Sequence, residues 1–522
     1  MKRILNVLML LSGVLLTVGC SSIPIEQHAQ PSFARNQHQP SHLKDVLAAS
    51  LQQHSGQSGF AIISEAQQAL QSRLAMANVA EHSLDMQYYI WHDDLSGVAL
   101  LSAIYRAAER GVRVRTLLDD YTVLTADADL ARIANHPNIE IKLYNPYGKR
   151  RSGSFARTLA FFGEFGRLNH RMHNKLMVAD NQLAITGGRN IGDEYFGLSD
   201  RKNFVDIDMF AVGPVVHDLS NSFDRYWNSD WAVSIDSIRS FDPFSGELEI
   251  LSAAEIEQVL QQRMQGYPTA PYTIEMDRQQ LLAQVETIPS LLRWSHATVT
   301  ADPPRKDLEQ QLEPLAVIEL LTQLGANAEH EILISSPYFI PGTIMVDGLS
   351  QLNQRGVEVK VLTNSLRTND VAAAHYGYAN IREQVLATGT KVYELRTDSA
   401  PGSLTQPQSK RGVELGLHAK VAVYDRRWVY IGTANLDPRS QLLNTEMGVV
   451  VDDPILAQQL AKQLLGLMTQ KSAYRLHHQQ AATCWFWIDN NNFEQQCSEP
   501  NVGWGDALMM KLVELLPIEE QL

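Results

Sequence analysis

The chain has 522 residues, of which 44% are hydrophobic, so it is long enough for two or three globular domains with substantial cores. Its formal net charge is -14, which excludes the overall positive field that holds a nucleic acid, although a local basic patch could still bind phosphate. The composition shows no sign of disorder or of a fibrous repeat.

The first residues predict export. Two basic residues precede an apolar run from Ile4 to Val18, which is short for a permanent membrane helix. Cys20 follows a glycine, and this arrangement resembles the bacterial lipoprotein signal, in which the leader is removed and the thiol is lipidated. We therefore expect a signal peptide over 1–19, lipidation of Cys20 and, because Ser21 comes next, sorting to the periplasmic face of the outer membrane. An uncleaved N-terminal anchor is the alternative.

Residues 20–58 are rich in Gln, His, Ser and Pro and show no sustained apolar period, so they are interpreted as a tether. From residue 59 onward, helix-like and strand-like stretches alternate, which favours an α/β fold.

An internal repeat organises the rest of the chain. A displacement of 245 residues separates Arg110 from Arg355, each of which opens an Arg-Gly-Val turn. Each copy ends in a predicted apolar strand followed by a helix that starts with proline. The blocks that recur at the same displacement are His173-x-Lys175 with Asp180 and His418-x-Lys420 with Asp425, and then Gly187-Gly188-x-Asn190 and Gly432-Thr433-x-Asn435.

The repeat predicts two pseudo-symmetric α/β/α domains, over 59–244 and 313–471. The segment 245–312 would connect them, and 472–522 would form a C-terminal tail. The final strand of the first copy is expected to run from Phe204 to Val212.

Two cysteines, Cys484 and Cys497, lie in the predicted tail. In an exported protein they could form a disulfide, and two unrelated thiols are the alternative.

The repeated blocks carry side chains suited to a phosphodiester. Residues two apart in a strand share a face, so His173 and Lys175 should point the same way. Lysine and asparagine donors can hold the two non-bridging oxygens, and a histidine can attack phosphorus or carry a proton at neutral pH. Because neither copy holds both histidine roles, the two domains are expected to face each other across one shared active-site cleft.

These blocks resemble the phospholipase D superfamily. Three further strings, Gly187 to Phe196, Ser336 to Gly342 and Leu515 to Glu519, are similar to bacterial cardiolipin synthases, most closely the C type. The resemblance implies exchange of one phosphodiester for another through a phosphohistidine, with no metal and no other cofactor. Phosphatidylglycerol would be the donor, and phosphatidylglycerol or phosphatidylethanolamine the acceptor, at a phospholipid membrane and without nucleic acid.

The resemblance also implies roles for individual residues. His173 is expected to be the nucleophile and His418 the general acid and base. Asp180 and Asp425 belong to the same motifs but are expected to fix local structure. The residues that would bind or flank the phosphoryl group are Lys175, Lys420, Asn190, Asn435, Gly188 and Thr433, and those that would orient the facing imidazoles are Asp206 and Glu446.

Two other functions stay open at this point. A phospholipase D or another phosphodiester hydrolase would use the same blocks, and the net charge of -14 disfavours a nuclease among these. A lipoprotein that binds phospholipid without turnover is the other alternative, and the two intact blocks argue against it.

Overall fold

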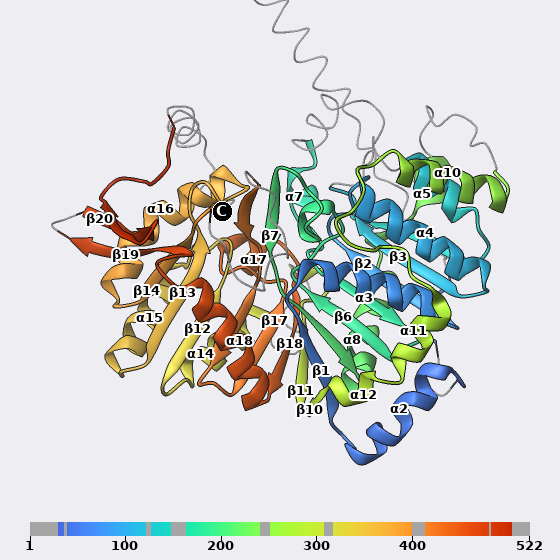
Figure 1. Cartoon of the computed structure of the whole chain (residues 1–522), viewed down its shortest axis with the longest axis horizontal. Helices are drawn as coiled ribbons and strands as arrows, with labels where there is room; N and C mark the ends of the chain where they lie inside the picture. Colours follow the sequence, from blue (N-terminus) through green and yellow to red (C-terminus); the bar gives the residue numbers. More distant parts are fainter. Residues whose placement is uncertain are drawn as a thin grey trace, which may run out of the picture.

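The computed structural model describes residues 30–35, 39–121, 127–147, 163–240, 251–306, 317–398, 413–479 and 482–503. The predicted signal peptide, Cys20 and the string from Leu515 to Glu519 lie outside these ranges. Two lobes lie side by side, each built around one large sheet (Figure 1). The predicted duplicated α/β architecture is confirmed.

The first lobe contains a nine-stranded sheet. Strands β2, β3 and β4 are parallel, and every other pairing in this sheet is antiparallel. In spatial order the strands are β10 (Arg293–Ser295), β1 (Ser58–Ile63), β8 (Asp208–Val212), β6 (Leu183–Gly187), β5 (Leu176–Ala179), β2 (Ser83–Tyr88), β3 (Arg113–Asp119), β4 (Ile139–Tyr144) and β9 (Ala232–Ser234).

The second lobe repeats this order in a ten-stranded sheet. The chain passes between lobes through β10 and β11, which lie at the edges of the two sheets. In spatial order the strands are β11 (Ala297–Ala301), β18 (Met447–Asp452), β17 (Trp428–Gly432), β16 (Val421–Tyr424), β12 (Glu331–Ser335), β13 (Glu358–Asn364), β14 (Lys391–Leu395), β19 (Ala473–Gln479), β20 (Ala482–Asp489) and β21 (Asn492–Gln496).

Helices cover both faces of each sheet, and this explains why the central strands β2 and β3 are buried on both faces, even at polar positions such as Asp85 and Arg115. Helices α8 (Pro214–Trp227) and α18 (Pro454–Leu467) lie between the two sheets, since α8 also contacts β11 and α18 also contacts β1. They share one buried core with side chains from both lobes. The outer helices are α3 (Ala66–Val79), α4 (Leu95–Glu109) and α5 (Asp127–Ala134) on the first lobe, and α14 (Val317–Ala326), α15 (Thr343–Gln354) and α16 (Ala372–Ala387) on the second.

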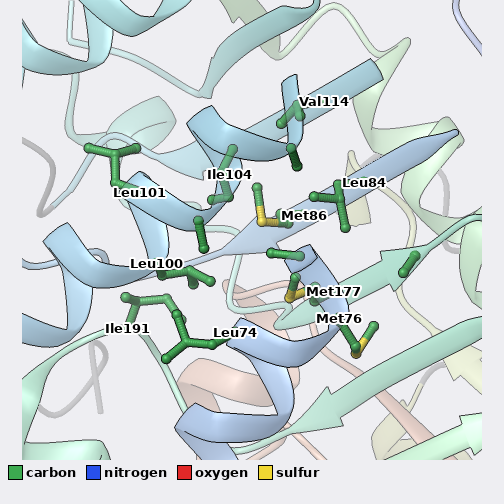
Figure 2. Packing of buried hydrophobic residues seen from close by; sticks show 14 of the residues in the cluster. Leu74, Met76, Leu84, Met86, Leu100, Leu101, Ile104, Val114, Met177 and Ile191 are labelled. Carbon is green, nitrogen blue, oxygen red and sulfur yellow. The ribbon is translucent and has the colours of Figure 1, made fainter. Parts of the chain in front are cut away.

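The outer core of the first lobe shows how this packing works. Leu74 and Met76 of α3 and Leu100 and Ile104 of α4 meet the outer face of β2 in Figure 2. All four side chains are at most 2% exposed, and burying each such side chain contributes about 1.5–3 kcal/mol relative to leaving it in water. The sheet therefore provides a rigid platform for the residues at its strand ends.

The remaining helices are short or belong to the connecting segments. These are α2 (His42–Gln53), α7 (Phe165–Leu168), α9 (Ile235–Ser240), α10 (Ala253–Gln265), α11 (Arg278–Val285), α12 (Ile288–Leu291), α17 (Pro438–Leu442) and the 3-10 turn η1 (Asp193–Tyr195). Helices α10 and α11 pack on α4 and α3, so the predicted connecting segment is part of the first lobe's surface. None of the helices in the described ranges is both long enough and apolar enough to cross a membrane.

Three segments differ from the pattern-based expectation. Helix α2 lies within the stretch interpreted as a tether and buries Leu43 and Leu47 in the first core. Strands β19 to β21 of the predicted tail extend the second sheet, and a disulfide joins Cys484 to Cys497. The predicted strand from Phe204 to Val212 is wrong: it divides into β7 (Lys202–Val205) and β8, because β7 leaves the sheet and pairs with β15 (Glu414–Leu417) of the other lobe.

Asp180 and Asp425 lie at matching hairpin turns, between β5 and β6 and between β16 and β17. Both have positive φ, 53° and 49°, as a tight hairpin turn requires. The Asp180 carboxylate accepts hydrogen bonds of 2.7–2.9 Å from the backbone N–H groups of Glu81, His82 and Ser83. Asp425 repeats this with the three residues at 329–331. Each aspartate therefore clamps the start of a central parallel strand.

Candidate active site

Two cross-lobe backbone contacts bring the repeated blocks together. Strands β7 and β15 form a parallel pair, and the Val205 carbonyl accepts hydrogen bonds from the N–H groups of His418 (2.8 Å) and Ala419 (3.1 Å). On the other side, His173 N–H donates to the Thr445 carbonyl at 3.0 Å. Each histidine segment is thus anchored to the segment that precedes a carboxylate of the opposite lobe.

The imidazoles pair with these carboxylates in a crossed arrangement. His173 Nδ1 lies 2.9 Å from Glu446 Oε2, and His418 Nδ1 lies 2.6 Å from Asp206 Oδ2. All four side chains are at most 8% exposed. An ionised carboxylate only accepts hydrogen bonds, so it places the proton on Nδ1 and leaves the lone pair of Nε2 available.

The two lysines lie beside the histidines that precede them. Lys175 Nζ donates to the His173 carbonyl and Lys420 Nζ to the His418 carbonyl, both at 2.6 Å. Among the described residues, that carbonyl is the one hydrogen-bond acceptor recorded for each ammonium. An ammonium has three N–H donors, so each lysine keeps donors for a substrate oxygen.

Burial and mutual repulsion shape the charge of this cluster. Burial, with Lys175 and Lys420 nearby, lowers the pKa of His173 well below its usual value. Burial and Lys420 also lower the pKa of His418, against the opposing effect of Asp206. Burial lowers the pKa of Lys420 to about 8 and that of Lys175 in the same direction. An anion bound between the lysines would relieve this repulsion, so the site is electrostatically suited to a phosphodiester.

The two carboxylates differ in charge state. Burial would raise the pKa of Asp206, but His418, Lys420 and Arg189 outweigh it and hold the pKa at about 2. Burial raises the pKa of Glu446 to about 7, against the lowering effects of Lys175 and a hydrogen bond from Thr433. His418 therefore faces a permanent anion, whereas the partner of His173 titrates near neutral pH.

Residues of the two glycine-containing strings contact these carboxylates. A Cβ at Gly188 would lie 2.0 Å from Asp206 Oδ1, so only glycine fits against that carboxylate. At the matching position, the Thr433 hydroxyl donates to Glu446 Oε2. Gly188 of the first copy thus contacts its carboxylate by close packing, whereas Thr433 at the matching position of the second copy contacts its carboxylate through a hydrogen bond.

The predicted asparagines are buried close to the same strings. Asn190 is tied on both sides: its Oδ1 accepts from Ile90 N–H at 3.2 Å, and its Nδ2 donates to the Tyr195 hydroxyl at 3.0 Å. Asn435 Oδ1 is buried with no hydrogen-bond partner among the described residues. Asp180 and Asp425 lie apart from this group, at the opposite ends of β5 and β16 from the two histidines.

Three aromatic residues of the site were not identified from the sequence. The ring of Tyr89 meets His173 edge-on at 5.1 Å between centroids, and Tyr195 meets His418 at the same distance. Phe204 lies 5.3 Å from His418. The repeat does not reveal Tyr195 or Phe204, because the residues at a displacement of 245 from them are Ser440 and Val449. Tyr195 did lie within the string from Gly187 to Phe196.

One group among the described residues has metal-ligand chemistry. The ligating atoms of His92, Asp94 and Glu194 lie within 4.8 Å of one another. Internal contacts account for this group, since Asp94 caps the N-terminus of α4 and His92 Nδ1 lies 3.2 Å from Glu194 Oε1.

Comparison with known proteins agrees with the geometry. A family model described as "Cardiolipin synthase, PLD-like domain" matches residues 74–227 and 321–468. Cardiolipin synthase C of Escherichia coli K12 is 36% identical over 480 residues, which is 90% of this chain and 97% of that protein. Cardiolipin synthase B of the same strain is 25% identical over 74% of this chain and 75% of its own length.

The fold has also been seen in a crystal. The phosphatidylserine synthase of Haemophilus influenzae Rd KW20 superposes with a TM-score of 0.54 at 13% identity, covering 90% of this chain and 96% of that one. The family model spans a large part of both lobes, and the relative from Escherichia coli extends over nearly the whole chain. The chain therefore belongs to the cardiolipin synthase family with phospholipase D-like domains.

Proposed function

We propose that this protein is a phosphatidyltransferase that forms cardiolipin from phosphatidylglycerol and a second phospholipid, through a phosphohistidine. The crossed pairing of His173 with Glu446 and of His418 with Asp206 carries the proposal. It gives two oriented imidazoles, of which one can attack and the other can transfer protons, beside two lysines that neutralise a phosphodiester.

In the first step, His173 is the nucleophile. Its lowered pKa keeps the ring neutral, and ionised Glu446 holds the proton on Nδ1, so the Nε2 lone pair attacks phosphorus. The P–N bond forms as the bond to the headgroup oxygen breaks. The bound phosphodiester offsets the effect of Lys420 that lowers the pKa of His418, and Asp206 raises that pKa, so His418 is protonated in the complex and gives its Nε2 proton to the leaving alcohol. Lys175 and Lys420 hold the non-bridging oxygens.

The second step reverses the first. Neutral His418 takes the proton from a hydroxyl of phosphatidylglycerol, whose oxygen attacks phosphorus and releases His173. Phosphatidylethanolamine, expected above as an acceptor, has no free headgroup hydroxyl, so it can enter only as the donor. The leaving alcohol is then ethanolamine, whereas a phosphatidylglycerol donor releases glycerol.

Product analysis tests the proposal. Purified protein supplied with mixed vesicles of phosphatidylglycerol and phosphatidylethanolamine, without added metal, is expected to form cardiolipin detectable by mass spectrometry. Phosphatidic acid as the sole product would instead assign a hydrolase, because water competes with the acceptor for the same phosphohistidine. Absence of any lipid product would contradict the proposed substrate class.

We further propose that the enzyme is exported and anchored through lipidated Cys20, at the periplasmic face of the outer membrane. The leader-like run over 1–19 supports this, as does the disulfide between Cys484 and Cys497, since such bonds persist in oxidising compartments. Labelled fatty acid is expected to enter the wild-type protein and a Ser22→Ala control, and not Cys20→Ser. Label retained by Cys20→Ser would contradict the assignment.

A further inference from the structure

An exposed carboxylate lies on the His418 side of the site. Asp370 belongs to the loop between β13 and α16, and its Oδ1 accepts a hydrogen bond of 2.8 Å from the Tyr338 hydroxyl. The neighbouring Asn369 carbonyl accepts a hydrogen bond of 3.2 Å from Lys202, whose ammonium lies 5.9 Å from the centroid of the Phe204 ring, and Phe204 contacts His418. The loop of Asp370 therefore reaches the His418 side of the site, and Asp370 raises the pKa of Lys420 against the effect of burial.

The loop that carries Asp370 is firmly held. The backbone N–H of Asn369 donates to the Ser365 carbonyl at 3.0 Å, and the hydroxyls of Ser365 and Thr368 lie 3.1 Å apart. Lys202 of β7 donates to the Asn369 carbonyl at 3.2 Å, so the loop also contacts the first lobe. Asp370 is presented from a fixed backbone rather than from a freely moving one.

Helix capping does not explain this carboxylate. Asp370 precedes α16, which begins at Ala372, but the N-cap residue Val371 makes no side-chain cap and the carboxylate bonds to Tyr338 instead. Within the described residues its Oδ2 accepts no recorded hydrogen bond. A negative charge beside a site for a phosphodiester anion weakens binding of that anion unless a positive charge offsets it. Lys202 of β7, whose pKa Asp370 raises against the effect of burial, forms no ion pair with this carboxylate among the described residues, so a positively charged substrate can supply the pairing charge.

The chemistry of the transfer places the headgroup near this carboxylate. His173 attacks phosphorus from one side, so the leaving alcohol departs on the opposite side, where His418 protonates it. Tyr195 and Phe204 flank the His418 ring at 5.1 and 5.3 Å, and Lys202, which binds the loop of Asp370, lies 5.9 Å from the centroid of the Phe204 ring. The alcohol part of the donor therefore departs toward the side of the site that carries the Asp370 loop.

Building on the proposed function, we propose that Asp370, oriented by Tyr338, binds the ammonium of an ethanolamine headgroup and thereby selects phosphatidylethanolamine as the phosphatidyl donor. The charge pattern fits a zwitterionic headgroup: Lys175 and Lys420 take the phosphate, and the carboxylate takes the ammonium that follows it. Glycerol, which lacks a positive charge, can donate hydrogen bonds to the carboxylate but forms no ion pair with it, so it gains less. Asp370 is a specificity-determining residue and takes no part in the bond changes.

The ratio of the two released alcohols tests this inference. Purified wild-type protein on equimolar vesicles of phosphatidylglycerol and phosphatidylethanolamine releases glycerol or ethanolamine according to the donor used. Asp370→Asn is expected to lower the ethanolamine-to-glycerol ratio about five- to tenfold, as expected for loss of one partly exposed charge-assisted contact. Asp370→Glu should retain part of the preference, and the exposed Asp347→Asn on α15 should leave the ratio unchanged.

Tyr338→Phe provides a second test that keeps the carboxylate. Without the hydroxyl, Asp370 loses its orienting hydrogen bond, and the ratio is expected to fall about threefold. An unchanged ratio in both Asp370→Asn and Tyr338→Phe, with cardiolipin still formed, overturns the inference and leaves the proposed function standing. Cardiolipin formed by the wild type without any ethanolamine release does the same. No transfer from either donor overturns both.

Discussion

Replacing His173 by alanine is expected to lower phosphatidyl transfer by about 10⁴-fold or more and to remove the covalent intermediate, because no other group would be left to attack phosphorus. His418→Ala is expected to lose about 10²–10⁴-fold through loss of acid–base assistance. The two variants should differ in their adducts. With a donor whose leaving group needs no protonation, His418→Ala should accumulate phosphatidyl-His173, whereas His173→Ala should form none.

Intact-protein mass spectrometry of acid-free quenched samples, together with the rate of cardiolipin formation, measures both effects. His170→Ala is the matched control, since His170 lies three residues from His173 but its ring faces Trp231 and the Leu443 carbonyl. That variant should stay within about threefold of wild type. A phosphatidyl adduct on His418 in the His173→Ala protein would reverse the assigned roles.

The crossed carboxylates should differ in their pH dependence. Asp206 is ionised throughout the neutral range and raises the pKa of His418, so Asp206→Asn lowers that pKa further. The imidazolium is then populated only at lower pH, and the alkaline limb of the kcat profile should move to lower pH. We expect a loss of about 10²–10³-fold in kcat at pH 7, the size associated with a misoriented acid–base histidine.

Glu446→Gln should behave differently because the pKa of Glu446 is about 7. Below that pH the carboxyl group is mostly protonated, and glutamine resembles it. Above that pH, wild type gains the ionised carboxylate that holds the His173 proton on Nδ1, and the variant does not. The loss in kcat should therefore be small at pH 6 and grow toward pH 8. Parallel profiles for Asp206→Asn and Glu446→Gln would contradict the asymmetry of the two pairs.

Sequence reasoning located the parts of the site that are duplicated. Two copies of a histidine and a lysine at the same displacement predicted two facing lobes, because one copy cannot supply both proton transfer and attack. The downstream carboxylates Asp206 and Glu446 could be assigned to the facing imidazoles since they occupy comparable places in the two copies. The repeat thus predicted contacts between the two lobes that a single block could not have indicated.

Features without a repeat partner were not accessible in this way. The stretch from Phe204 to Val212 has the composition of one strand, and its division depends on pairing with β15, more than 200 residues away. The aromatic residues that contact the two histidines, Tyr89, Tyr195 and Phe204, all belong to the first lobe. The Asp370–Tyr338 pair belongs to the second lobe. The strands place Asp180 and Asp425 at hairpin turns, away from the histidines that share their motifs.

The crossing of the two pairs has a consequence for the newly made protein. A chain in which only the first lobe has folded contains His173 and Asp206 but neither Glu446 nor His418. It therefore has the proposed nucleophile without its orienting group and without the proposed acid. In the proposed mechanism, transfer begins only when the segment from β15 to β18, which carries His418 and Glu446, is in place. A chain with one folded lobe is therefore inert toward the lipids around it, with no pro-segment or inhibitor needed to keep it so.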